Sequence, residues 1–225
     1  MASELLIPID IYCERTSADF WAEPVNALSN AAFIVAAVIG WRAARRAGRL
    51  DGPMLLLIAL TASIGFGSFL FHTVATRWAA LADVVPIGLF IVTYLSIVMR
   101  RFFGLRWPVA VLFGASFVPA GMALTAVIPP ALTSAVSGST AYLPALLFLA
   151  VCGGLLAARG HSGGRALLLG AGLFIVSLTF RSVDAPLCEA VPIGTHFLWH
   201  LFNGALLAWL LVTMVRYGRE RTPHR

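Results

Sequence analysis

Seven stretches of the chain are apolar throughout and almost free of charged residues. Short segments rich in arginine, glycine, serine or proline separate them. Each stretch is close to the ~20 residues with which a helix crosses the hydrocarbon core of a bilayer, and the sixth is the shortest. The pattern predicts an all-α fold, a bundle of seven membrane-spanning helices in a single domain, residues 1–225. The predicted spans are 26–46, 53–73, 81–99, 107–128, 140–158, 166–180 and 194–215.

The composition supports an integral membrane protein. Hydrophobic residues make up 60% of the chain and charged residues only 12%, whereas a soluble domain has roughly 25% charged residues. The formal net charge is +6, and the chain contains no lysine. In a membrane protein such an excess of arginine lies in the loops and reports topology, so a nucleic-acid partner is not expected.

The arginines alternate between the two sides of the predicted bundle. Most of them surround the first, third and fifth breaks or lie in the basic tail 216–225, whereas most acidic residues lie in the segment 1–25 and the other loops. The positive-inside rule then places the N-terminus outside and the C-terminus in the cytoplasm. An arginine-rich, lysine-free chain is typical of a GC-rich bacterial genome, so we expect the bacterial inner membrane with the outer face toward the periplasm.

Five polar residues lie at one depth, near the outer ends of three predicted spans. Ser68 and His72 close the second span, Asp83 opens the third, and His196 and His200 open the seventh. The spacing of four places Ser68 with His72, and His196 with His200, on a common helix face. Ionisable groups within a membrane are costly and usually functional, so these residues predict a site.

Three histidines at one level predict a zinc site. A catalytic zinc typically has three protein ligands and an open position, and the H-x3-H spacing of His196 and His200 supplies two ligands from one helix, with His72 as the third. Asn203 shares their helix face and is expected to support the ligands. The alternative is that each histidine makes an interhelical hydrogen bond without a metal.

The two remaining polar residues suit hydrolysis at such a metal. Asp83 is expected to accept a proton from water as a general base. Ser68 is expected to donate a hydrogen bond to a developing oxyanion. Arg181 and Asp184, which precede the seventh span, are expected to form a structural ion pair or a loop cap.

The ordered set S-x3-H-x10-D followed by H-x3-H resembles the alkaline ceramidase family, part of a broader group of membrane hydrolases that includes the adiponectin-type receptors. The segments YCERTSADFWAEPVNALSN (12–30) and RSVDAPLCEAVPIGTHFLWH (181–200) are also similar to that family. The resemblance covers nearly the whole chain. It implies a zinc-dependent amidohydrolase that takes a lipid amide from the bilayer and cuts the N-acyl bond of ceramide, releasing a fatty acid and a sphingoid base. It assigns zinc to His72, His196 and His200, the general base to Asp83 and the oxyanion donor to Ser68.

The resemblance also implies a calcium site and a disulfide. Asp10, Glu14 and Glu23 are the calcium candidates, although Asp10 stands three residues before the cysteine where the family has its aspartate two before, and Thr16 replaces an asparagine ligand. The alternative is an acidic outer segment without an ion. The implied disulfide joins Cys13 and Cys188, which an oxidising outer compartment permits.

Other functions remain open at this stage. A lipid receptor or sensor of the adiponectin-receptor type would keep zinc mainly for structure, and the short loops of the chain favour an enzyme over it. A hydrolase of another N-acylated lipid is a second alternative, because many bacteria make little ceramide. A transporter is a third, and it would show inverted repeats that the sequence lacks. The sequence makes no prediction of the oligomeric state.

Overall fold

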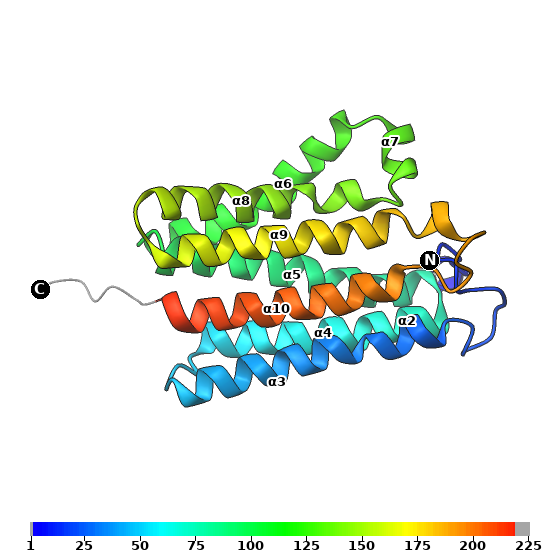
Figure 1. Cartoon of the computed structure of the whole chain (residues 1–225), viewed down its shortest axis with the longest axis horizontal. Helices are drawn as coiled ribbons and strands as arrows, with labels where there is room; N and C mark the ends of the chain where they lie inside the picture. Colours follow the sequence, from blue (N-terminus) through cyan, green and yellow to red (C-terminus); the bar gives the residue numbers. More distant parts are fainter. Residues whose placement is uncertain (1, 219–225) are drawn as a thin grey trace, which may run out of the picture.

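The structure is a computed structural model that describes residues 2–218; most of the predicted basic tail, 219–225, lies outside the described residues. Its long helices run nearly side by side (Figure 1). They are α3 (Ala31–Arg46), α4 (Gly52–Val74), α5 (Arg77–Arg101), α6 (Trp107–Val127), α8 (Leu143–Ala158), α9 (Ser162–Ser182) and α10 (His196–Tyr217). The short elements are α1 (Ala2–Leu5), α2 (Pro24–Ser29), α7 (Pro130–Ala135) and the 3-10 turns η1 (Ser139–Tyr142) and η2 (Ala185–Leu187).

The predicted all-α bundle of seven spans is confirmed. Seven helical segments are long and apolar enough to cross a membrane; the first combines α2 with α3, and the fifth combines η1 with α8. The described residues form no β-strand, apart from one isolated bridge between Pro8 and Thr76. Which end of the bundle faces the cytoplasm remains a prediction.

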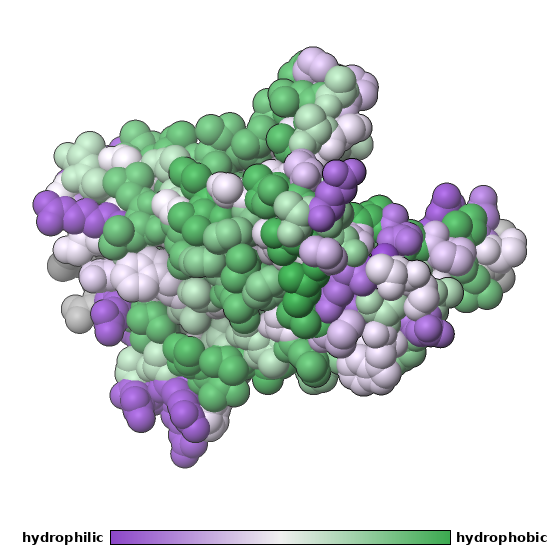
Figure 2. Space-filling view, turned by 45° about the vertical axis from the view of Figure 1, so that its right-hand side comes forward, coloured by the Kyte–Doolittle hydropathy of each residue, from purple (hydrophilic) through white to green (hydrophobic). Residues whose placement is uncertain are grey.

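The surface matches a lipid environment. Figure 2 shows hydrophobic residues across the middle of the face in view and hydrophilic residues toward its ends. Large apolar side chains of the long helices are well exposed, among them Phe66, Leu112 and Leu169, at 64–70%. Such a large continuous apolar surface is rare on soluble monomers and is expected where lipid replaces water.

Helix α10 is the most buried span. It packs on α3 and α9 along its length, while α4 pairs with α5, and α8 with α9 (Figure 1). Because α10 lies at the centre, the histidines in its first two turns are directed into the bundle rather than toward lipid. Its burial is therefore what makes a site within the membrane possible.

Two glycines allow the helices around the site to touch backbone to backbone. A Cβ on Gly67 of α4 would collide with the Ala82 carbonyl and lie 3.1 Å from the Asp83 nitrogen of α5. A Cβ on Gly204 of α10 would lie 2.7 Å from the Ala32 Cβ of α3. Small residues at such crossings permit the close helix packing that stabilises membrane bundles. The first contact brings the turn carrying Ser68 against the start of α5.

The sixth span is longer than its hydropathy predicts. The apolar stretch 166–180 is extended to Ser162–Ser182 in α9. The His161 side chain caps this helix by accepting a hydrogen bond from the Gly163 nitrogen, at 3.0 Å. The polar and glycine residues of the first turn lower the hydropathy but leave the helical hydrogen bonding intact. The predicted span therefore begins after the true start of the helix.

The end of α6 departs from the bundle. Figure 1 shows α7 and the adjoining end of α6 projecting away from the other helices. The buried residues of α6, Ala110 and Gly114, both lie in its first half, and Pro119 interrupts its hydrogen bonding further on. The segment that the sequence left as a break between the fourth and fifth spans contains the extra helix α7.

Candidate metal centre

The three predicted zinc ligands meet at one point in the bundle. His72 lies in the last turn of α4, and His196 and His200 lie in the first two turns of α10. One ring nitrogen from each comes within 4.8 Å of the others, and the three residues are at most 2% exposed. The spacing of four along α10 gives two ligands from one face, and the end of α4 brings the third.

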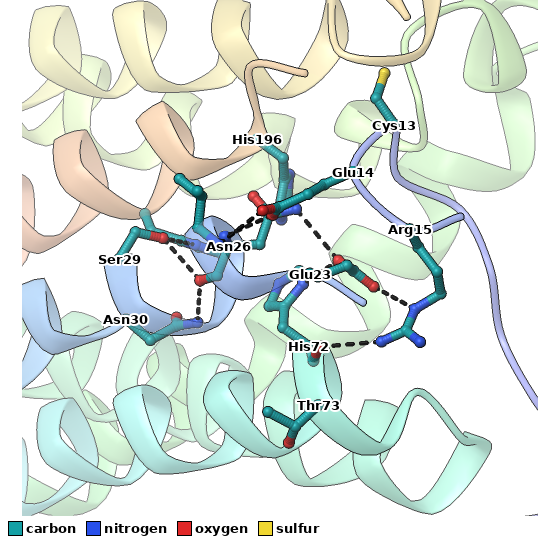
Figure 3. Close-up of polar contacts among 12 residues, drawn as sticks. Cys13, Glu14, Arg15, Glu23, Asn26, Ser29, Asn30, His72, Thr73 and His196 are labelled. Carbon is teal, nitrogen blue, oxygen red and sulfur yellow. Dashed lines mark hydrogen bonds and ion pairs between the residues drawn. The ribbon is translucent and has the colours of Figure 1, made fainter. Parts of the chain in front are cut away.

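Hydrogen bonding fixes which nitrogen of His72 is free. Its Nδ1 lies 2.6 Å from Glu23 Oε2, while Glu23 Oε1 accepts a hydrogen bond from Arg15 Nε at 2.5 Å (Figure 3). Burial alone would raise the pKa of Glu23, but hydrogen bonds and charge from His72 and Arg15 outweigh burial and lower the pKa of this carboxyl. The ionised Glu23 holds the Nδ1 proton, which leaves His72 Nε2 buried and without a partner. A carboxylate behind a histidine is the usual support for a metal ligand.

The same reasoning applies to His200. Ser29 donates its hydroxyl proton to the Asn26 carbonyl at 2.7 Å, so its oxygen accepts from His200 Nδ1, also at 2.7 Å. The Nε2 of His200 is then a lone-pair donor. His196 has no hydrogen-bond partner at Nδ1, and its ring stacks on Tyr12 with centroids 3.6 Å apart.

The histidine cluster fits a zinc ion. Imidazole nitrogen is a preferred zinc ligand, and buried ring nitrogens without partners are costly unless something binds them. At least two of the three rings carry such a nitrogen. Three protein ligands leave one coordination position open, which is the arrangement of catalytic rather than structural zinc sites.

A cavity with His200 in its lining runs into the bundle. Its polar end is lined by Ser68, Asp83, His200 and Asn203, and the remaining lining is almost entirely aliphatic and aromatic. The lining residues of α5 extend from Asp83 to Leu95, a distance of ~18 Å at 1.5 Å per residue. This is about the thickness of one hydrocarbon leaflet, half of the ~30 Å core.

The calcium candidates do not gather. Glu14 accepts hydrogen bonds at 2.7 Å from the backbone nitrogens of Val25 and Asn26, where it caps the first turn of α2, a favourable place for a carboxylate. Glu23 is committed to His72 and Arg15, and Asp10 is exposed. Across residues 2–218 the cluster of metal-ligating side chains is the three histidines, so calcium gains no support.

Arg15 takes up the oxygen atoms around Glu23. Its guanidinium donates to Glu23 and to the carbonyl oxygens of Ser17, Asp19 and His72, at 2.5–3.4 Å. Figure 3 shows this side chain reaching from the N-terminal segment to Glu23 and His72. Groups of oxygen atoms are the usual ligands of a hard cation such as calcium. Here the positive charge beside the oxygens is the guanidinium of Arg15.

We therefore expect calcium to leave the protein unaffected. Calcium at up to millimolar concentration, the range of weak extracellular sites, should not raise the unfolding temperature of zinc-loaded protein in detergent. Arg15→Met should destabilise it by ~3–5 kcal/mol, because the buried Glu23 carboxylate loses its arginine ion-pair partner. The double variant Arg15→Met/Glu23→Gln is the matched control and should regain part of the loss. Stabilisation of the wild type by calcium would contradict this prediction.

A disulfide attaches the N-terminal segment beside α10. It joins Cys13 to Cys188, with Cα atoms 5.1 Å apart. Gly194 packs against it with a positive φ of 69°, and a Cβ there would lie 2.9 Å from the Cys13 Cβ, so only glycine fits. Together with the hydrogen bond from the Ile9 nitrogen to the Ala75 carbonyl, the disulfide holds Tyr12 over the histidines.

Asp184 is a loop cap rather than the partner of Arg181. Its carboxylate accepts hydrogen bonds from the backbone nitrogens of Cys13, Thr195 and His196, at 2.6–3.2 Å. These bonds join the N-terminal segment to the start of α10, and within residues 2–218 no ion pair involves Arg181. Of the two roles that the sequence allowed for this pair, the structure contains the cap.

Removing the disulfide should destabilise the protein by ~2–5 kcal/mol, because the bond closes a very long loop in the unfolded chain. The test is the unfolding temperature of a Cys13→Ser/Cys188→Ser double variant in detergent. Cys152→Ser changes the free, buried cysteine of α8 and is the control for an altered sulfur. Adding a reducing agent should lower the stability of the control and leave the double variant unchanged. Equal stability of the double variant and the wild type would be inconsistent with this role.

Sequence reasoning missed several side chains around the histidines. Tyr12, Arg15 and Ser29 are not among the predicted site residues, and Glu23 is predicted to bind calcium rather than to support His72. A signal was present for Ser29, because Asn26, Ser29 and Asn30 place polar groups on one face at the start of an otherwise apolar span. Tyr12 carried no such signal, because its contact with His196 depends on how the N-terminal segment folds back.

The fold and the site define a polytopic membrane protein with a buried three-histidine centre, one histidine of which lines an apolar cavity. A family model described as Ceramidase matches residues 10–224, nearly the whole chain. The chain belongs to the ceramidase family. Neither the comparison with curated proteins nor the comparison with solved structures gave a match.

Proposed function

We propose that the protein is a zinc-dependent amidohydrolase of the membrane, which cuts the N-acyl bond of ceramide or of a related N-acylated lipid. The observation that supports this most strongly is the convergence of three buried histidines, one of which, His200, lines the polar end of an apolar cavity. Membership of the ceramidase family supports the same class of reaction. The products are a free fatty acid and an amine.

His72, His196 and His200 would hold the zinc ion. When bound, zinc would supply the Lewis acidity that polarises an amide carbonyl and makes water a stronger acid. Glu23 and Ser29 keep the rings of His72 and His200 in the tautomer that presents Nε2. Asn203 is one turn beyond His200 and lines the same end of the cavity, with its Nδ2 buried and free to orient a bound group.

Asp83 and Ser68 are assigned the proton transfer and the oxyanion. Both line the cavity end that contains His200, and the contact at Gly67 packs their helices closely there. Asp83 would take a proton from the attacking water and pass it to the nitrogen of the leaving amine. Ser68 would donate a hydrogen bond to the oxygen that becomes negative in the tetrahedral intermediate.

The acyl chain is assigned to the cavity. Beyond Asp83 and His200 the lining consists of side chains such as Ile87, Phe90 and Leu206, which favour hydrocarbon over water. The cavity is about one leaflet long, so an acyl chain of an ordinary membrane lipid fits along it. A lipid of the outer leaflet would thus bind with its amide at the histidines, provided the N-terminus faces outward as the arginines predict.

The test is an assay with the purified protein. We expect bound zinc and release of fatty acid from a short-chain ceramide or from another N-acylated lipid, and loss of both after zinc is removed with a chelator. Zinc-loaded protein that binds these lipids but releases no fatty acid would instead indicate a sensor. A reporter fused to the C-terminus, active only in the cytoplasm, tests the predicted orientation.

A further inference from the structure

Within residues 2–218, Arg181 forms no ion pair with a carboxylate. It lies in the last turn of α9, and its Nε and Nη1 atoms are buried without hydrogen-bond partners. Two other arginines that reach into the bundle, Arg15 and Arg101, are each paired with a carboxylate at 2.5 Å. A buried charge costs several kcal/mol unless it is compensated, so an unpaired arginine in a membrane domain requires an explanation.

Aromatic rings surround the Arg181 guanidinium. Its central carbon lies 6.0 Å from the ring centre of Tyr12, 5.6 Å from that of Tyr142 and 5.7 Å from that of Trp199. Cation–π contacts of this kind stabilise a guanidinium and hold it in place. The N–H donors of a guanidinium lie in its plane and point outward. Within the described residues, the Nε and Nη1 donors have no hydrogen-bond partner, so they are available to a ligand.

The three rings also connect Arg181 to the metal centre. Tyr142 and Trp199 line the same cavity as Asp83 and His200. Tyr12 stacks directly on His196. Arg181 thus adjoins the polar end of the cavity, one aromatic ring away from the histidines and away from the apolar part that suits an acyl chain.

We propose that Arg181 binds an anionic group, a carboxylate or a phosphate, on the amine portion of the lipid amide. This inference rests on the proposed function. With the amide at the histidines and the acyl chain in the apolar cavity, the part of the substrate that reaches Arg181 is the part beyond the amide nitrogen. A guanidinium with unpartnered N–H donors can form charge-assisted hydrogen bonds to the oxygens of such an anion.

The geometry distinguishes this anion from the fatty-acid product. The product carboxylate forms from the carbonyl carbon of the amide. It therefore forms at the histidines rather than beside Arg181. The anion that Arg181 binds is already present in the substrate. The preferred substrates are then acidic N-acylated lipids rather than neutral ones.

Three probes with the same oleoyl chain test the proposal: N-oleoylethanolamine, which is neutral, N-oleoylglycine, which carries a carboxylate, and N-oleoyl phosphoethanolamine, which carries a phosphate. The wild type should bind and hydrolyse at least one of the acidic probes about tenfold better than the neutral probe, as expected for a charge-assisted hydrogen bond. The two acidic probes show which anion fits. Arg181→Met should remove this preference, and Arg181→Lys, which keeps the charge but not the two-pronged geometry, should reduce it.

Binding is measured separately from turnover, by the rise in unfolding temperature of zinc-depleted protein in detergent. If the zinc-loaded wild type hydrolyses none of the probes, the proposed function is contradicted. The binding measurement still tests the role of Arg181 in that case. A wild type that binds the neutral probe as well as both acidic ones would overturn the inference, even if neither variant folds. Arg181→Met protein that still prefers the acidic probes would also overturn the inference. So would Arg181→Met protein that loses affinity only for oleate, because Arg181 would then bind the fatty-acid product.

Discussion

Replacing His200 by alanine should remove bound zinc and amide hydrolysis together. His200 is buried, contributes one of three converging ring nitrogens and lines the cavity. Two remaining histidines do not make a zinc site of the usual three or four protein ligands. The measurement is the zinc content of the purified variant, about one ion per chain being expected for the wild type, together with fatty-acid release. Because the variant also loses a hydrogen bond to Ser29, its folding is checked by its unfolding temperature.

Two further variants test this prediction, one with a smaller expected loss of zinc affinity and one with no expected loss. Ser29→Ala removes only the acceptor behind His200, so zinc affinity should fall by ~10–100-fold, the usual effect of changing a group behind a ligand. His161→Ala is the matched control, because this histidine caps α9 at the opposite end of the bundle. His161→Ala should retain full zinc content. If His200→Ala protein binds as much zinc as His161→Ala protein, the three-histidine centre is wrong.

Replacing Asp83 by asparagine should leave zinc bound and reduce kcat by ~10²–10⁴-fold, the usual contribution of a general base. Asp83 lines the cavity beside Ser68 and His200 and is absent from the metal-binding cluster. An amide of nearly the same shape cannot accept the proton of the attacking water. The measurements are kcat for fatty-acid release and zinc content.

Glu189→Gln is the control for Asp83→Asn, because it makes the same kind of change at an exposed position before α10. It should keep wild-type kcat. Ser68→Ala should lower kcat by ~10²–10³-fold, as the loss of one oxyanion donor does in other hydrolases. An Asp83→Asn variant with wild-type kcat would exclude the residue as the base, and one that has lost its zinc would indicate a role in metal binding.

The spans were predictable because lipid imposes one simple requirement on them. A run of ~20 apolar residues shows a crossing helix wherever it occurs. The prediction was less accurate where polar residues continue a helix, as at Ser162–Arg165 in α9, and where α7 follows α6 in a segment without a strong pattern. Hydropathy measures the lipid-compatible part of a helix rather than its hydrogen-bonded length.

The histidine cluster was predictable from helical spacing and depth, whereas its surroundings were not. His196 and His200 share a face because four residues make about one turn, and the end of α4 lies at the same level. The partners Glu23 and Ser29 come from the first span and the segment before it. Their pairing with particular imidazoles depends on the packing of α2 against α4 and α10, which no local pattern encodes.

The pairing of the charged residues around the site was also not predictable from the sequence. Asp184 and Arg181 are three residues apart, and this spacing alone cannot say whether they pair. In the fold, three backbone N–H groups take up the Asp184 carboxylate, and one of them belongs to a residue far away in the chain, Cys13. Because the Asp184 carboxylate is taken up in this way, it does not pair with Arg181, which lies among aromatic rings instead.

The Cys13–Cys188 bond has a consequence for biogenesis. The segment that it anchors supplies Tyr12, Arg15 and Glu23, and all three lie against the histidines or their supports. Thiols stay reduced in the cytosol, so this bond persists only on the exported side of the membrane. A chain inserted upside down would therefore lack a properly assembled centre, and correct topogenesis becomes a precondition for a working enzyme.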